Sequence, residues 1–156
     1  MLTAPSGLPL ASFKVEGLRE LERALAELPK ATAKNTLKRT LKLAAQPIAD
    51  HAQRLAPRDT GNLAEGIMVT TKKPKKHKSK GRAFAEIYIG PKARSVNAVP
   101  QEFGTVNHPA QPFMRPAWDA EKETALDIIK NELGEQITKA AARLAKKAAR
   151  KAAKGA

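Results

Sequence analysis

The stretch Val99–Trp118, VPQEFGTVNHPAQPFMRPAW, constrains the fold more than any other part of the sequence. It holds four of the eleven prolines and the only tryptophan. Proline fixes its own φ and favours an extended conformation for the preceding residue, so His108–Arg115 is predicted to be an ordered, mostly extended connection. Pro116 suits the first turn of a helix, where its missing N–H is no loss. The stretch therefore predicts a stiff corner in front of a helix.

The residues around this corner predict how it joins the rest of the domain. Ser95–Thr105 is expected to return the chain to a sheet, with a short strand at Gln101–Phe103 that ends at Gly104, which can adopt backbone angles that other residues resist. The large apolar side chains are interpreted as anchors to the core and not as ligand-binding groups. They are Phe103, Phe113, Met114 and Trp118.

The composition limits the classes of protein. With 29 Lys and Arg against 15 Asp and Glu, the formal charge of +14 favours polyanions or acidic protein surfaces as partners. The absence of cysteine excludes disulfides and thiolate metal sites. Only 4% of residues are aromatic, so we expect a modest core that assembly with other chains extends. No apolar run is long enough to span a bilayer, and the N-terminus lacks a basic signal-peptide start, so a soluble protein made in the cytosol is expected.

Two helices are predicted before the sheet. Leu18, Leu21, Leu25 and Leu28 form one stripe of an amphipathic helix that ends before Pro29. A second apolar stripe runs over 37–55, and Pro47 within it is expected to kink that helix or split it near Leu43.

Ile67–Thr71 and Phe84–Gly90 have the pattern of two strands of a hairpin. The segment 72–82 between them carries seven Lys or Arg and no acid, so it is predicted to be a long basic loop, either solvated or in contact with a negative surface. If it binds DNA, the phosphates are the target, because it has no aromatic residue for base stacking.

A helical stripe runs from Ala117 towards the C-terminus. Acidic residues come early in it and basic residues late, which complements the helix dipole. Its last dozen residues are interpreted either as a helix stabilised by a partner or as a frayed basic tail.

The sequence holds few signals of chemistry. Asp59-Thr60-Gly61 also occurs at the catalytic aspartate of aspartic proteases, but here a helix leads into it, so we interpret it as a cap and turn. Asn62 and Glu65 follow at capping-box spacing. His51, His77 and His108 share no ligand spacing with acids. We therefore expect no enzyme, no catalytic residue, no metal and no cofactor.

The order of these motifs resembles one protein family. The motifs are Gly17-Leu18 before the leucine helix, Ala56-Pro57 and Asp59-Thr60-Gly61 with Leu63, the hairpin end Ile87-Tyr88-Ile89-Gly90, then Glu102-Phe103-Gly104-Thr105 and the run from His108 to Ala117. Over Val15–Leu133 the chain resembles the neck and tail-component family of long-tailed double-stranded-DNA bacteriophages, typified by the tenth gene product of a lambda-like coliphage.

The resemblance implies a non-enzymatic virion protein of the head–tail junction. It would be made in the host bacterial cytoplasm and assemble as a homo-oligomeric ring that joins the portal side to the tail tube around the DNA channel. The implied partners are further copies of the chain, neighbouring neck, tail-terminator or tail-tube proteins, and phage DNA, with no membrane. The alternative is a basic architectural nucleic-acid-binding protein, which the net charge and the Lys/Ala tail suggest.

The predicted fold is α+β: a small antiparallel sheet with a long basic hairpin loop, packed against two N-terminal helices and a long C-terminal helix. A flexible arm over 1–12, one domain over 13–138 and a basic helical tail over 139–156 are expected. The predicted assembly interface consists of Glu102, Phe103, Gly104, Thr105, Gln111, Pro112, Phe113, Arg115, Pro116 and Trp118. The predicted electrostatic contacts with DNA or acidic neighbours are Lys72, Lys73, Lys75, Lys76, Lys78, Lys80, Arg82, Lys139, Arg143, Lys146, Lys147, Arg150, Lys151 and Lys154.

Overall fold

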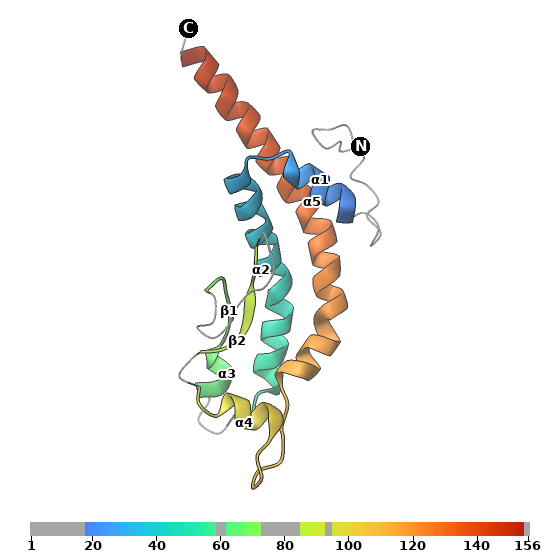
Figure 1. Ribbon diagram of the computed structural model, residues 1–156, viewed down its shortest axis with the longest axis vertical. Coiled ribbons are helices and arrows are strands. Elements are labelled where there is room, and N and C mark those ends of the chain that lie inside the picture. The colour runs from blue at the N-terminus through green and yellow to red at the C-terminus, as the bar shows by residue number, and fades with distance from the viewer. Residues whose placement is uncertain (1–17, 59–61, 73–84, 93–94, 155–156) are drawn as a thin grey trace. The chain divides into compact units, whose positions relative to one another are not determined.

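The computed structural model describes residues 18–58, 62–72, 85–92 and 95–154 (Figure 1). The chain divides into two compact units, one made of Met1–Thr40 and Ile128–Ala156 and the other of Leu41–Asp127. The predicted N-terminal arm and the Asp59-Thr60-Gly61 turn lie outside the described residues.

The first helices follow the apolar stripes of the sequence. Helix α1 spans Leu18–Ala26 and ends before Pro29, as predicted. Helix α2 spans Lys30–Leu55 and continues through Pro47, so the predicted alternative of a split near Leu43 is wrong. Proline removes only one helical hydrogen bond. The bond that is lost would have joined the N–H of residue 47 to the carbonyl of Leu43. Because Leu43 is 47% exposed, water can bind this carbonyl instead.

Leucine and isoleucine side chains form the core of the first unit. Leu21 and Leu28 pack with Leu133 and Ile137, which come from the middle of α5 (Met114–Lys154). The predicted stripes are confirmed where Leu21, Leu25 and Leu28 pack with residues of the last helix, whereas Leu18, at the start of the first stripe, is 36% exposed. Helix α5 continues through Lys154 (Figure 1). Its side chains beyond Leu144 are exposed.

The second unit contains the predicted hairpin. A short helix α3 (Asn62–Gly66) leads into β1 (Ile67–Thr70), which pairs antiparallel with β2 (Tyr88–Pro91). Met68 faces Gly90 and Val69 faces Ile89 in the register. The α+β fold class is confirmed. The second strand begins later than predicted, and most of the basic loop between the strands lies outside the described residues.

Alanines let the elements of the second unit approach closely. Ala49, Ala52 and Ala56 recur at helical spacing and face Ile67 of the hairpin and Phe113 of the corner. The Gln53 side-chain amide also donates to the backbone carbonyl of Ile67 at 2.9 Å. Phe113 is thus the one aromatic side chain of this buried cluster of described residues.

The strand predicted at Gln101–Phe103 is wrong. The segment forms a short helix, α4 (Ala98–Phe103), and Gly104 ends this helix and not a strand. Pro100 lies in the first turn of α4, where a missing N–H costs no helical hydrogen bond. Ser95–Thr105 therefore does not return the chain to the sheet.

Candidate assembly site

The corner of the second unit is organised by one carboxylate. Glu102, on α4, accepts hydrogen bonds from the backbone N–H groups of Phe113, Met114 and Arg115 at 2.8, 2.9 and 3.0 Å. These residues form the start of α5, so Glu102 caps a helix that begins more than ten residues further along the chain. A carboxylate at a helix N-terminus also interacts favourably with the helix dipole.

Pro116 completes this cap. The first four N–H groups of an α-helix have no partner inside the helix. Three of them bind Glu102, and the fourth position is Pro116, which has no N–H. The placement of Pro116 in the first turn is confirmed, and the cap shows why a single carboxylate is enough at this end of α5.

Gly104 allows the sharp turn between α4 and the connection. Its φ is +76°, and a Cβ at this position would lie 2.9 Å from the backbone nitrogen of Ala110. Beyond it, Thr105 and His108 form an isolated antiparallel bridge, and the N–H of Gln111 donates to the carbonyl of Gln101 at 2.7 Å. The corner is therefore closed by backbone hydrogen bonds on both sides of Gly104. The predicted connection is confirmed as non-helical chain up to Phe113, whereas Met114 and Arg115, which were predicted to belong to it, are already part of α5.

The apolar anchors divide into two groups. Phe113 is only 1% exposed and Met114 packs against the same cluster, so both anchor the corner as predicted. Phe103 and Trp118 are 65% and 54% exposed, so their predicted role as core anchors is wrong. Their chain neighbours Glu102 and Ala117 are less exposed: Glu102 is half-buried and Ala117 is buried.

Exposed apolar side chains gather in this part of the sequence. Among the described residues, nine large hydrophobic residues are exposed, and five of them lie between Val96 and Trp118. These five are Val96, Val99, Phe103, Val106 and Trp118, which we call the apolar corner surface. Exposed apolar residues scattered singly need no explanation, whereas a concentration of them is typical of an interaction site.

Arg115 links the two helices of this surface. Its guanidinium carbon lies 5.9 Å from the centre of the Phe103 ring, within the range of a cation–π interaction. Val99 and Phe103 are four residues apart on α4, and Arg115 and Trp118 are three apart on α5, so each pair shares one helix face. The contact brings these two faces together.

The electrostatics of the corner favour an ionised Glu102. Burial alone would raise the pKa of its carboxyl group, but the N–H groups of Met114, Phe113 and Arg115, together with the charge of Arg115, outweigh burial and lower the pKa below its ordinary value of 4.5. Glu102 therefore stays charged at neutral pH, and the cap is intact there.

The remaining predicted interface residues occupy the same corner. Thr105, Gln111 and Pro112 are exposed, while Gly104 and Pro116 are half-buried. The structure thus brings the ten predicted residues together in one unit, but Glu102 and Phe113 face inward and hold the corner in shape. Sequence reasoning missed the cap because no local spacing joins Glu102 to residues 113–115.

The predicted electrostatic residues lie apart from the corner in the sequence and differ in their surroundings. Lys72 is exposed at the end of β1, and the other basic residues of the 72–82 loop lie outside the described residues. Lys139 is paired with Glu135 at 3.0 Å. Arg143 and Lys147 line a cleft, and the other basic residues near the end of α5 are exposed: Lys146, Arg150, Lys151 and Lys154.

One polar contact joins residues that sequence spacing could not connect. His51 Nδ1 lies 2.9 Å from Glu121 Oε1, across 70 positions of the chain.

In the described ranges, no group of three or more His, Asp or Glu is arranged to hold a metal ion, and no helix is both long and apolar enough to cross a membrane.

Residues 19–104 match a family described as bacteriophage HK97-gp10, putative tail-component. The match covers more than half of the chain, so this protein belongs to that family of phage tail components. No curated protein and no solved structure matches the chain. The family's description names a part of the virion, which agrees with the structural virion role that the motif order implied.

Proposed function

We propose that this protein is a structural component of the phage head–tail junction. Copies of the chain would form a homo-oligomeric ring that joins the portal side to the tail tube around the DNA channel. Membership of the tail-component family supports a place in the virion. The observation that supports assembly into a ring is the apolar corner surface. A protein that functions as a monomer gains nothing from five exposed apolar side chains in one stretch of its chain.

The geometry of the corner suits a contact between identical subunits. The Glu102 cap and the turn at Gly104 fix the positions of α4 and the start of α5, so Phe103 and Trp118 are presented without a large cost in side-chain and loop ordering. Such preorganisation strengthens binding. Aromatic residues are also enriched at the centres of protein–protein interfaces. Repeating one heterologous contact around an axis closes a ring.

The test is the oligomeric state of the purified protein. We expect ring-shaped particles in electron microscopy and an oligomer in analytical ultracentrifugation, and we expect the double variant Phe103→Ala/Trp118→Ala to be a folded monomer. The control is Leu43→Ala/Leu55→Ala, which removes two apolar side chains of similar exposure outside the corner. A strictly monomeric unaltered protein that joins neither tails nor capsids contradicts the proposal.

A second candidate is a basic architectural nucleic-acid-binding protein. It is favoured by the end of α5, where Lys146, Arg150, Lys151 and Lys154 are all exposed on one helix. It requires tight, steeply salt-dependent binding of duplex DNA by the isolated protein. Binding that disappears near physiological salt rejects this candidate as the primary function.

A further inference from the structure

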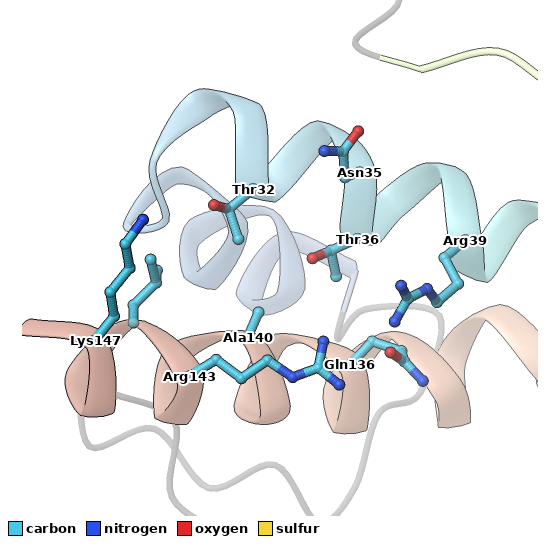
Figure 2. A pocket seen from close by; sticks show the side chains of 9 residues that line it. Thr32, Asn35, Thr36, Arg39, Gln136, Ala140, Arg143 and Lys147 are labelled. Carbon is cyan, nitrogen blue, oxygen red and sulfur yellow. The ribbon is translucent and has the colours of Figure 1, made fainter. Parts of the chain in front are cut away.

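The first unit contains a basic cleft between α2 and α5. It has a volume of about 260 Å³ and is distinct from the apolar corner surface, which belongs to the second unit. The lining residues are Thr32, Asn35, Thr36 and Arg39 of α2, and Gln136, Ala140, Arg143, Leu144 and Lys147 of α5 (Figure 2).

The lining follows from helical spacing. Thr32, Thr36 and Arg39 are four and three residues apart, and Ala140, Arg143 and Lys147 are three and four apart. Each set therefore lies on one face of its helix, and the two faces meet at the cleft. Arg143 and Lys147 are among the predicted electrostatic residues, whereas Arg39 is not, because it lies more than a hundred residues away from them.

The cleft has an apolar floor and a basic rim. Ala140 is buried, and Leu144 packs against the leucine core of this unit. Figure 2 shows the guanidinium groups of Arg39 and Arg143 in the space between the two helices, with the amide of Gln136 beside them. Lys147 lies at the other end of the cleft, near Thr32.

No acidic group within the described ranges neutralises this rim. Arg39, Arg143 and Lys147 have no salt bridge to any described residue, whereas Lys139, one turn before Arg143, is paired with Glu135. Three cations placed around one cleft repel each other, and an anion that enters the cleft removes this repulsion.

We propose that this cleft binds an acidic side chain of a partner protein, with the carboxylate held between Arg39 and Arg143. Guanidinium groups bind carboxylates through paired, charge-assisted hydrogen bonds. The floor of Ala140 and Leu144 accommodates the aliphatic stem of a glutamate, and Asn35, Thr32 and Gln136 offer hydrogen bonds to the peptide on either side.

The shape of the site favours a protein over DNA as the source of the anion. Duplex DNA is too wide to enter a cleft between two packed helices. Its phosphates bind more readily to cations on an open surface, such as those of Lys151 and Lys154. The inference specifies a partner for Arg143 and Lys147, which the sequence predicts to contact either DNA or acidic neighbours. It does not depend on ring formation through the apolar corner surface, so the two proposals fail independently.

The test measures binding of two probes to the full-length protein by isothermal titration calorimetry near physiological salt. The probes are an acetylated and amidated hexaglutamate peptide and a short DNA duplex. The test variant is Arg39→Gln/Arg143→Gln. Its control is Arg54→Gln/Arg150→Gln, which removes the same charge from exposed positions of α2 and α5 outside the cleft. All four side chains are exposed, and circular dichroism checks that both variants are folded.

We expect the cleft variant to bind hexaglutamate about tenfold more weakly, because it loses charge-assisted hydrogen bonds. The control variant should bind hexaglutamate less than about threefold more weakly, because it loses only the contribution of net charge. Equal losses in the two variants, or no peptide binding by the unaltered protein, overturn the proposal. A loss of DNA binding that is confined to the cleft variant also overturns it and identifies the anion as a phosphate.

Discussion

The corner around Glu102 and the basic end of α5 are both exposed surfaces, but they are built in opposite ways. In the corner, a carboxylate, a left-handed glycine and a buried phenylalanine fix the backbone, and apolar side chains face outward. Beyond Leu144, α5 has no buried side chain and consists only of alanine, lysine and arginine. The corner is therefore suited to specific, salt-insensitive contact, whereas the basic end is suited to attraction that salt weakens.

The largest effect expected is from Phe113→Ala. Phe113 is 1% exposed, and removing its ring should lower the free energy of unfolding by about 3–5 kcal/mol through lost burial and the cavity left behind. Urea denaturation measures this change. The same truncation at Phe103, which is 65% exposed, should cost less than about 1 kcal/mol. Similar costs at the two positions contradict the division of the corner into an inward and an outward side.

Next in size is Gly104→Ala. At φ +76° a side chain is strained, and the new Cβ would lie 2.9 Å from the Ala110 nitrogen, so we expect a loss of about 1–3 kcal/mol. Gly90→Ala is the matched control, because a Cβ there meets nothing within 4 Å. If both variants melt at the same temperature, the turn at Gly104 is not needed to close the corner.

Glu102→Gln is expected to cost about 1–2 kcal/mol at neutral pH, the range for loss of a helix cap. The pKa of Glu102 is lowered in the folded state, so the stability that its charge contributes is complete above 4.5 and is lost as the pH falls through the lower, folded value. Thermal unfolding from pH 7 to pH 3 should show the difference between the unaltered protein and Glu102→Gln shrinking over this acidic range. A difference that is independent of pH means that the ionised carboxylate is not the cap.

The smallest effect on stability is expected at the basic end of α5. Replacing Arg150, Lys151 and Lys154 by glutamine should change the free energy of unfolding by less than about 0.5 kcal/mol, because these exposed side chains have no packing to lose. The same variant should bind an anionic partner with a weaker dependence on salt. A stability loss above 1 kcal/mol would show instead that this end of the helix is packed, and the contrast with the corner would fail.

Sequence reasoning located the elements that have a periodic signal. The leucine stripe of α1, the hairpin strands and the long last helix were predicted because their apolar residues repeat at helical or strand spacing. Helix α4 was missed because six residues with one proline carry too short a pattern to distinguish a helix from a strand. The exposure of Phe103 and Trp118 and the Glu102 cap were missed because both depend on tertiary structure.

The cleft is a second feature that sequence reasoning could not predict as a whole. Arg143 and Lys147 were recognised as basic residues, but their partner across the cleft, Arg39, is adjacent only in the folded chain. The ring, the junction and the domain boundaries remain proposals that the sequence motivates. The corner and the cleft now supply residue-level tests of how the subunit meets its neighbours.

The hydrogen bonds of the corner have a consequence for the order of folding. They join residues at most 13 positions apart, from Thr105 with His108 to Glu102 with Arg115. Closing a loop of this size costs little chain entropy, and contacts between nearby residues form early. The leucine core of the first unit must instead bring α1 together with residues more than a hundred positions away. We therefore expect the corner to acquire its shape first, so that a newly made subunit carries its assembly surface before its most distant contacts have formed.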